Sequence, residues 1–572
     1  MADPVPDSSS FARRPWLALY PPDVPAEIDA GALRTLPELL ADSVARYGER
    51  PAYACFGRTL SFAALDRSSR DFAAWLQAQG LRPGERVALM LPNVLPYPVA
   101  LFGLLRAGLV AVNVNPLYTA RELRHQLADS GAAAIVILEN FAHTLQAVRD
   151  TLPALRVVVV AALGDMAGPL RGALINAVVR HVQHKVPPWS LPGALRWPEV
   201  LRQGATLAFM PPPLALADTA CLQYTGGTTG LSKGAVLMHR NLAANMLQIR
   251  AWLGSRLRPG EEVALTPLPL YHVFSFTCNC LLFMHLGGLC VLVPNPRDLP
   301  ALLRTWRRWP VTVMTGINTL FAKLLDEPGF AQLDLSRLKL VVGGGMAVQQ
   351  GVAERWARAT GGFILEGYGL TEAAPVVCAN THDACVWDGS VGLPLPSTEV
   401  EVRDEQGRPL PPGAAGELWL RGPQVMRDYW RQPEETAQVL APDGWLRTGD
   451  VAVMDADGRV RIVDRLKDMI VVSGFKVFPN EVEEVLARHP AVREAACIGA
   501  PDAASGEAVH ALLVLRAGMQ VSEDELHAHC RVALTAYKRP RTYRFCAELP
   551  KTPVGKVLRK ALRQEMAENH HP

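Results

Sequence analysis

Apolar runs and amphipathic helical patterns alternate through the N-terminal part of the chain. Four of the runs predict buried strands, at residues 86–92, 132–138, 155–163 and 338–345. Residues 62–80 place Leu65, Phe72 and Leu76 on one face of a predicted helix that ends at Gly80. Strands that alternate with helices imply parallel sheets covered by helices on both faces, so we expect an α/β fold.

From Glu399 onward the pattern changes to short β segments. Turn residues at 405–407, 411–413 and 455–458 separate these segments. Short strands joined by such turns are typical of antiparallel hairpins or a small barrel. We therefore expect a small β-barrel at the end of a large N-terminal domain that spans residues 1–464.

Residues 465–572 show a different, α+β pattern. Asn480 is predicted to cap one helix, and Ser522 with Glu525 forms a capping box for another. The first of these helices is expected to bury Val482, Val485 and Leu486. Strand-like runs at 493–500 and 508–516 lie between the two helices. We expect a separate small C-terminal domain, joined to the large one near residues 464–468.

Residues 263–296 contain no Asp, Glu, Lys or Arg. The run is longer than the ~20 residues that a membrane-spanning helix needs, so a membrane segment is one interpretation. Prolines, glycines and histidines interrupt it and divide it into a loop, a helix and a strand of core length. The favoured interpretation is buried core, with the apolar lining of a lipid pocket as a variant of it.

Composition narrows the function classes. The 572 residues include 58 basic and 55 acidic side chains, a net charge of +3. This balance argues against nucleic acid as a partner, because nucleic-acid binding needs clustered Lys and Arg. The N-terminus has no apolar signal sequence, and the ten cysteines form no C-x-x-C pair. We expect a cytoplasmic protein, with peripheral contact to the inner face of the cell membrane and a homodimer left open.

The stretch QYTGGTTGLSKGAV, residues 223–236, combines four glycines with three threonines, a serine and a lysine. Glycines let backbone N–H groups surround phosphate oxygens, and a nearby ammonium adds charge. The Walker motif G-x-x-x-x-G-K-[ST] does not match, because Ser232 precedes Lys233 and Gly234 follows it. A phosphate-binding loop and a simple flexible turn are both open interpretations of the loop alone.

Four further stretches carry polar groups that a core does not require. They are LEGYGLTEAAP at 365–375, GWLRTGD at 444–450, VDRLKD at 463–468 and PKTPVGKVLRK at 550–560. Each alone has a structural explanation: Glu372 as a helix N-terminal charge, Asp450 as a turn residue, Lys556 as a solvated charge. Only their combination and order is specific.

In this order, YTGGTTGLSKG, GYGLTE, TGD and PKTPVGK resemble the motifs of the adenylate-forming (AMP-binding) superfamily. The closest resemblance is to bacterial long-chain fatty-acid:CoA ligases (long-chain acyl-CoA synthetases). It implies an AMP-forming ligase that converts a fatty acid, ATP and CoA to acyl-CoA through an acyl-AMP intermediate, releasing pyrophosphate and then AMP. The alternatives are a fatty-acyl-AMP ligase that loads a separate carrier protein, and a catalytically silent lipid-binding protein.

The resemblance implies the ATP site. The ATP-binding residues would be Thr225, Gly226, Gly227, Thr228, Thr229, Gly230, Ser232, Lys233, Gly343, Gly344, Gly345, Gly367, Tyr368, Gly369, Thr371, Asp450 and Arg465. Tyr368 would stack on adenine, and Asp450 would hold the ribose hydroxyls. Glu372, with Thr225, would coordinate Mg²⁺, because this hard ion takes oxygen ligands.

The resemblance also implies catalytic, acyl and CoA groups. Lys556 would bridge the attacking carboxylate and the α-phosphate, with Glu372 and His272 as the other catalytic residues. The fatty-acid pocket would include His272, Phe276 and Gly345. For the second half-reaction the small domain would rotate about Lys467. Rotation would bring the CoA-side residues Gly474, Phe475 and Lys476 to the site in place of Lys556.

Overall fold

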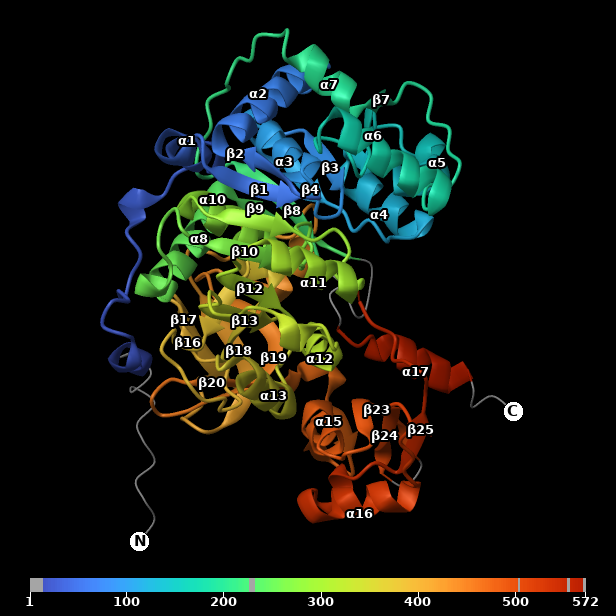
Figure 1. Ribbon diagram of the computed structural model, residues 1–572. Coiled ribbons are helices and arrows are strands. Elements are labelled where there is room, and N and C mark those ends of the chain that lie inside the picture. Colours follow the sequence, from blue (N-terminus) through green and yellow to red (C-terminus); the bar gives the residue numbers. More distant parts are fainter. Residues whose placement is uncertain (1–13, 226–231, 503–504, 553–555, 569–572) are drawn as a thin grey trace.

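The computed structural model describes residues 14–225, 232–502, 505–552 and 556–568. Its strands form four sheets (Figure 1). The seven-stranded sheet has the order β7-β6-β5-β3-β4-β8-β9, and its pairs are parallel except for β8 with β9. Its strands are β3 (Arg86–Met90), β4 (Val110–Asn113), β5 (Ala134–Leu138), β6 (Val157–Ala161), β7 (Leu195–Arg196), β8 (Thr219–Tyr224) and β9 (Gly234–Met238).

The nine-stranded sheet has the order β16-β15-β14-β13-β12-β10-β11-β1-β2. Its central pairs, from β14 to β1, are parallel, and antiparallel strands close both edges. The strands are β1 (Pro51–Cys55), β2 (Arg58–Ser61), β10 (Val263–Thr266), β11 (Leu289–Leu292), β12 (Val313–Gly316), β13 (Leu340–Gly344), β14 (Ile364–Gly369), β15 (Val376–Ala379) and β16 (Leu393–Pro394).

Both faces of the parallel strands are buried, as the continuous apolar runs predicted. In β3, Val87 and Leu89 face the largest apolar cluster, whereas Ala88 and Met90 face a second cluster on the opposite side. Alternate residues of a strand point to opposite faces, so both faces need cover. The predicted helix at 62–80 is confirmed as α2 (Phe62–Ala78).

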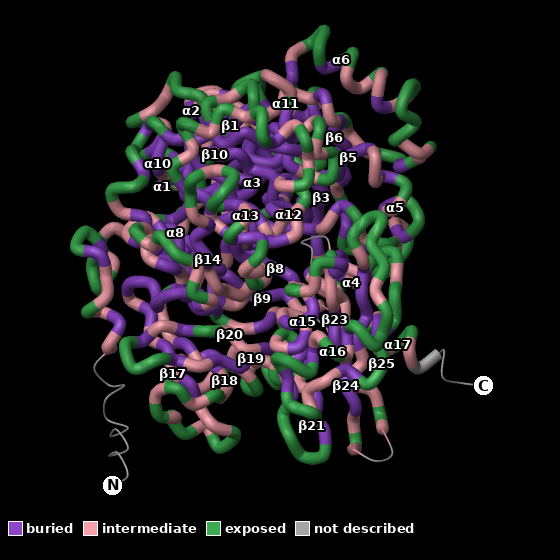
Figure 2. The backbone as a smooth tube through the Cα atoms, turned by 60° about the horizontal axis from the view of Figure 1, so that its bottom comes forward, coloured by how far each residue is buried: buried purple, intermediate pink, exposed green. Residues whose placement is uncertain are grey.

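The other helices of the N-terminal part of the chain pack around the seven-stranded and nine-stranded sheets and between them (Figure 2). Their bounds are α1 (Leu36–Tyr47), α3 (Pro96–Arg106), α4 (Ala120–Ser130), α5 (Ala142–Gln146), α6 (Pro169–Ala177), α7 (Trp197–Gly204), α8 (His239–Leu253), α9 (Val273–Ser275), α10 (Leu282–Leu286), α11 (Leu299–Arg308), α12 (Asn318–Asp326) and α13 (Gln350–Thr360). The predicted α/β architecture is confirmed.

The charge-free segment 263–296 is buried core, as favoured from the sequence. It forms strand β10, then α9, a π-helical turn (Phe276–Leu281) and α10, and ends in strand β11. Its helical part packs against α8 and α1. Within the described ranges, no helix combines the length and apolar character needed to cross a membrane.

The β segments after Glu399 form an open sheet, so the predicted small barrel is wrong. Strands β17 (Glu399–Arg403), β18 (Ala415–Arg421), β19 (Leu446–Met454) and β20 (Val460–Arg465) pair in sequence order, all antiparallel. The edge strands β17 and β20 do not pair with each other in the described residues, so the sheet does not close. The apolar face of this sheet instead joins the largest core cluster. Helix α14 (Pro433–Val439) precedes β19.

The C-terminal sheet has the order β22-β21-β24-β23, with β25 parallel to β24. Its elements are β21 (Ile470–Val472), β22 (Phe475–Val477), α15 (Pro479–Ala487), β23 (Val492–Asp502), β24 (Gly506–Leu515), α16 (Glu523–Ala533), β25 (Thr542–Phe545) and α17 (Arg559–Glu568). The predicted strands, the buried side chains of α15 and the Ser522–Glu525 capping box are confirmed.

The predicted Asn480 cap of α15 is wrong. Pro479 starts this helix, and the residue before it, Phe478, makes no side-chain cap hydrogen bond. Proline suits the first helical position because it lacks the N–H that a cap would satisfy. Asn480 therefore lies one residue inside the helix, where its N–H donates to Asp464 at 2.8 Å.

Candidate functional site

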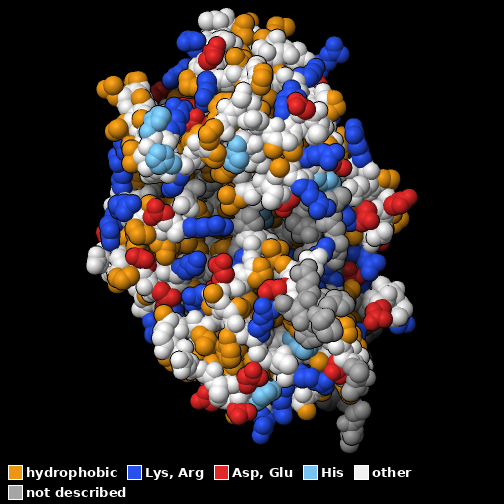
Figure 3. Space-filling model, turned by 90° about the vertical axis from the view of Figure 1, so that its right-hand side faces the viewer, with side chains coloured by type: hydrophobic (Ala, Val, Ile, Leu, Met, Phe, Trp, Pro, Cys, Tyr) orange, Lys and Arg blue, Asp and Glu red, His pale blue; other side chains and the backbone are white. Residues whose placement is uncertain are grey.

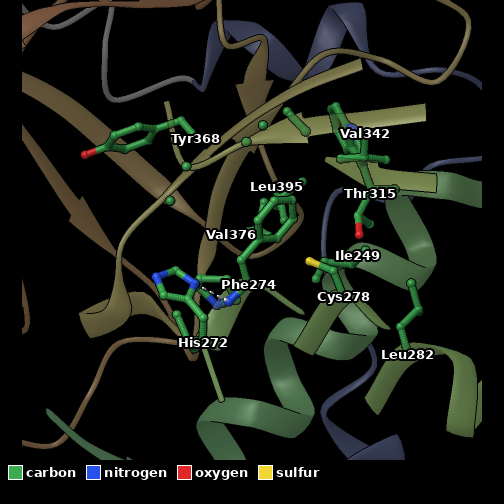
Figure 4. Close-up of a pocket in the computed structure, with 18 of the residues that line it drawn as sticks. Ile249, His272, Phe274, Cys278, Leu282, Thr315, Val342, Tyr368, Val376 and Leu395 are labelled. Atoms are coloured by element: carbon green, nitrogen blue, oxygen red, sulfur yellow. Dashed lines mark hydrogen bonds between the residues drawn. The ribbon is translucent and has the colours of Figure 1, made fainter. Parts of the chain in front are cut away.

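A cavity opens beside the carboxyl ends of β13 and β14 and encloses about 920 Å³ of empty space, part of it open to solvent. Figure 4 shows His272 and Tyr368 on one side of it and Ile249, Cys278 and Leu282 on the other. One end is thus polar and the other apolar. Ligands of open α/β sheets bind at this edge of the strands.

The polar end consists largely of backbone. Gly344, Gly345, Gly367, Tyr368, Gly369 and Thr371 line it. Gly345 has a φ of 77°, in the left-handed region that favours glycine. A Cβ on Gly369 would lie 2.2 Å from the carbonyl oxygen of Pro375, so only glycine fits there. The glycine pattern predicted from GGG and GYG therefore serves to bring bare backbone to the cavity.

Lys556 also lines this cavity, although it lies beyond the whole C-terminal sheet in sequence. Its N–H donates to the Thr552 hydroxyl at 3.0 Å. Burial and the nearby Arg465 guanidinium lower the pKa of Lys556 to about 8, against the opposing effect of Asp450 and Glu372. With this pKa, Lys556 is mostly an ammonium at pH 7 and loses its proton as the pH rises through about 8.

His272 lines the cavity from the N-terminus of α9. Its Nδ1 accepts the Phe274 N–H at 3.4 Å, which fixes the ring. Burial, followed by the Lys556 charge, lowers the pKa of His272 to about 4. The ring is therefore neutral at pH 7 and adds no positive charge beside Lys556.

Asp450 and Tyr368 meet where β19 and β14 approach. The Tyr368 hydroxyl donates to Asp450 Oδ2 at 2.6 Å. Arg465, opposite Asp450 in the β19–β20 pair, places its Nε 3.5 Å from Oδ1. The predicted adenine-side tyrosine, ribose-side aspartate and supporting arginine thus form one connected group.

Lys233 and Glu372 are linked through Tyr429, a residue that sequence reasoning missed. The Tyr429 hydroxyl donates to Glu372 Oε1 at 2.6 Å. Its ring lies under the Lys233 ammonium, 5.2 Å from the ring centroid, and Lys233 also pairs with Glu435. No spacing in the sequence signalled Tyr429 or Glu435, because their segment reaches Lys233 only by pairing beside β9.

The glycine-rich loop joins two antiparallel strands, β8 and β9. It does not lead directly into a helix, because β9 precedes α8. Thr225 and Lys233 close the loop through a 2.9 Å bond from the Thr225 N–H to the Lys233 carbonyl, and the Ser232 carbonyl lies 3.0 Å from His125 Nε2. The predicted residues Gly226, Gly227, Thr228, Thr229 and Gly230 lie outside the described residues.

The apolar end of the cavity lies between α8, the π-helical turn and the nine-stranded sheet. Its lining includes Ile249, Trp252, Leu253, Cys278, Leu282, Phe283, Val313, Val342 and Leu395. The predicted pocket residue Phe276 is 1% exposed and packs in the core instead of lining the cavity. Phe274 and Cys278, two residues to either side of it, line the cavity.

The predicted CoA-side residues do not line the cavity. Gly474 forms the turn between β21 and β22, with a φ of 83°. Phe475 is 56% exposed and stacks on Tyr537, and Lys476 pairs with Glu405 at 3.0 Å. The β21–β22 hairpin therefore lies outside the cavity that Lys556 lines.

Lys467 lies in a single helical turn, Leu466–Asp468, between β20 and β21. Contacts on both sides of it hold the C-terminal sheet in place. Arg559 of α17 pairs with Glu483 at 2.8 Å and lies 4.0 Å from Asp464, which precedes the turn. Arg563 pairs with Asp468, which ends it, at 2.9 Å.

Two family models match the chain: AMP-binding enzyme over residues 40–430, and AMP-binding enzyme C-terminal domain over residues 481–556. The chain belongs to the AMP-binding enzyme family. Ser232 and Lys233 of the glycine-rich loop lie in the first matched segment, and Lys556 lies in the second.

Curated relatives of this AMP-binding enzyme match it end to end. The long-chain-fatty-acid–CoA ligase of Escherichia coli O157:H7 is 51% identical over 554 residues, 97% of this chain and 98% of the relative. The ligase of the same name from Bacillus subtilis is 37% identical over 567 residues, 98% of this chain and 99% of the relative.

Solved structures share the architecture of this AMP-binding enzyme. The anthranilate CoA ligase AuaEII, in complex with anthranoyl-AMP, superposes with a TM-score of 0.83 at 28% identity, covering 96% of this chain and 99% of that one. ATP-bound MatB from Rhodopseudomonas palustris gives a TM-score of 0.81 at 28% identity, covering 94% and 100%.

Proposed function

We propose that this enzyme activates long-chain fatty acids to acyl-CoA in two half-reactions. The acid first attacks the α-phosphorus of ATP and releases pyrophosphate, and the CoA thiol then attacks the acyl-AMP and releases AMP. Relatives named long-chain-fatty-acid–CoA ligase cover nearly the whole chain at about half identity. The observation that carries the proposal is a cavity that joins an apolar end to Lys556 and His272.

The apolar end supports a long acyl chain as the substrate. Each buried methylene contributes about 0.8 kcal/mol to binding, so an apolar channel favours long chains over acetate. The carboxylate would then lie at the polar end, beside His272. Because the ring of His272 is neutral, it can donate one hydrogen bond to the carboxylate without pairing with it as an ion.

Lys556 supplies the charge for the first half-reaction. The carboxylate and the triphosphate are both anionic, and their approach concentrates negative charge in the transition state. An ammonium that bridges them stabilises this state, most strongly in a site that excludes water. Asp450 would bind the ribose hydroxyls, with Arg465 holding its carboxylate and Tyr368 beside the adenine. Ser232, Lys233 and the glycine-rich loop would hold the β- and γ-phosphates.

The residues near Lys233 fit a magnesium ion. Glu372 and Thr225 offer a carboxylate and a hydroxyl, and Mg²⁺ takes such oxygen ligands. Tyr429 occupies Glu372 Oε1 and so orients the second oxygen of the carboxylate. A bound Mg²⁺ would neutralise phosphate charge as pyrophosphate leaves.

The second half-reaction requires a different closure. We propose a large domain of residues 1–464 and a small domain of residues 465–572 that rotates about Lys467. Rotation would withdraw Lys556 and bring Gly474, Phe475 and Lys476 to the cavity, with Lys476 near the CoA phosphates. The exposed position of this hairpin supports the proposal, because its groups are available to a second partner.

The experiment that tests this function measures thioester formation with ATP, magnesium and CoA across acids from acetate to oleate. We expect kcat/KM to rise with chain length and to be greatest for long chains. Preference for benzoate or another aromatic acid would contradict the substrate assignment. Formation of oleoyl-AMP without transfer to CoA would instead favour the ligase that loads a separate carrier protein. We also propose a cytoplasmic location.

A further inference from the structure

Helix α6 and the π-helical turn that continues it, Val178–Val182, expose an unusual set of apolar side chains. Leu170 is 87%, Leu174 is 65% and Val182 is 70% exposed. Figure 2 shows α6 projecting from the body of the molecule. Large apolar side chains gathered on one projecting element mark an interaction site, whereas single ones are ordinary.

The inner side of the same helix is firmly held. Gly172 lies against Gly164, where a Cβ would come within 2.4 Å of the Gly164 carbonyl oxygen. The Gly164 N–H donates to Asn176 Oδ1 at 2.7 Å, and Arg180 binds Glu139 at 2.7 and 3.0 Å. Positions 172, 176 and 180 form one stripe of the helix, and 170 and 174 lie on the opposite side. The exposed leucines thus belong to an ordered, outward-facing surface.

The segment that carries this surface contains only basic charged residues. Residues 166–198 contain no Asp or Glu, but they include Arg171 and Lys185, both exposed, and two exposed histidines, His181 and His184. On the upper left of Figure 3, hydrophobic side chains lie beside pale-blue histidines. In the part of the chain that the structure describes, neither Arg171 nor Lys185 forms an ion pair.

Glu139 and Asp165, two acids that contact this helix, do not offset this charge. Glu139 is buried and already pairs with Arg180 and Arg196. Asp165 accepts the Ala162 N–H at 2.8 Å and faces Asn176, on the inner side of the helix. The surface therefore combines an apolar stripe with basic flanks, which is the pattern of helices that lie in the interface of an anionic membrane.

We propose that α6 and its π-helical turn are the docking surface of this enzyme for an anionic lipid bilayer. The proposal rests on the proposed function, since a membrane is where a long-chain acid partitions. The 14 helical residues are about 20 Å long, less than the ~30 Å of a hydrocarbon core, so the helix lies on the bilayer. A second copy of the chain is a poorer partner, because a symmetric contact would bring the same basic groups together.

The test is flotation of the full chain with phosphatidylcholine vesicles prepared with and without phosphatidylglycerol. We expect the protein to float with the anionic vesicles, and more weakly as salt is raised. The variant Leu170→Gln/Leu174→Gln/Val182→Gln should lower the partition coefficient about tenfold or more, because it removes three apolar contacts. Arg171→Glu/Lys185→Glu should abolish the preference for anionic vesicles.

The matched control is Val386→Gln/Val532→Gln, which removes equally exposed side chains, 76% and 91% exposed, elsewhere on the molecule. This control should float like the parent protein. Equal flotation of the triple variant and the parent overturns the proposal, as does an equal loss in the control. A triple variant that becomes monomeric in light scattering while vesicle binding persists would assign the surface to a second copy and also overturn it.

Activity separates this proposal from the proposed function. Octanoate dissolves as monomers, so its conversion to octanoyl-CoA needs no membrane. The triple variant should convert octanoate as fast as the parent protein, because none of its changed residues lines the cavity. If the parent protein floats but forms no thioester from any fatty acid, the proposed function fails while the docking surface stands.

Discussion

At the residue scale, the active-site prediction rests on how the cavity changes the charge of Lys556. Its pKa is lowered to about 8, so the ammonium is present below pH 8 and is lost as the pH rises through that value. We predict that kcat/KM for the adenylation half-reaction falls about tenfold per pH unit above pH 8. The measurement is fatty-acid-dependent pyrophosphate release against pH.

The control for this prediction is Lys556→Arg, whose guanidinium stays charged throughout the range. This variant should be slower at pH 7 but should show no decline above pH 8. An identical decline in both proteins would mean that another group is responsible.

Tyr429 gives a second residue-scale prediction. Its hydroxyl orients Glu372, so Tyr429→Phe should raise the KM for magnesium-ATP about tenfold, as expected for loss of one hydrogen bond to a charged group. Excess magnesium should partly restore the activity. Tyr543→Phe removes a comparable hydroxyl far from the cavity, one that lies 3.4 Å from His527, and serves as control. A normal KM in Tyr429→Phe would show that Tyr429 has no influence on the magnesium site.

The sequence could indicate the motif residues but not their partners. Lys556, Tyr368, Thr371 and the paired glycines are recognisable because they lie in short conspicuous stretches, and the cavity brings them together. Tyr429 and Glu435 could not be found, since only folding places them beside Lys233. Phe276 was chosen by its position in a motif, but it lies on the side of the helical segment opposite Phe274 and Cys278 and packs in the core.

At the scale of the element, the apolar patterns were the most reliable guide. Runs that became β3, β5, β6 and β13 are almost entirely apolar, because both of their faces are buried. These patterns do not show whether a sheet closes into a barrel, because closure depends on pairing between strands that are distant in sequence. The sequence therefore indicated the hairpins after Glu399 correctly but not that their sheet stays open.

Arg559 yields a prediction about how α17 is held. It is the cation for the buried Asp464 and for Glu483, and removing it leaves both carboxylates without this partner. Arg559→Ala should lower the free energy of unfolding by about 3 kcal/mol, as for other broken buried pairs. Denaturant unfolding followed by circular dichroism measures this change. The neighbouring exposed Lys560→Ala should alter it by less than about 0.5 kcal/mol, and a similar loss in both variants would contradict the assignment.

At the scale of the whole molecule, one cavity must serve two reactions. Lys556 lies in it and the hairpin of Gly474 does not, so under the proposed mechanism the present arrangement would serve the first half-reaction. Exchange of Lys556 for the Gly474 hairpin at the cavity would require the backbone near Lys467 to turn. The relation of the two halves could not be read from sequence patterns, because it depends on contacts such as Arg559 with Asp464 across the join.

Lys467→Pro tests this exchange. Proline fixes φ and stiffens the linker, so we expect the protein to remain in the present closure. Pyrophosphate release should persist, while thioester formation from oleoyl-AMP and CoA should fall about a hundredfold, on the scale of a mispositioned reacting group. Lys467→Ala, which keeps the linker flexible, should retain both. Full turnover in Lys467→Pro would contradict a rotating small domain.

The most direct test of the central claim separates the two half-reactions in Lys556→Ala. Oleate-dependent exchange of labelled pyrophosphate into ATP reports adenylation, and oleoyl-CoA formation from supplied oleoyl-AMP reports transfer. We predict that the parent protein exchanges only when oleate and magnesium are present, and that Lys556→Ala loses this exchange almost completely but keeps the transfer. Equal loss of both steps, or exchange that ignores oleate in the parent protein, would contradict the account.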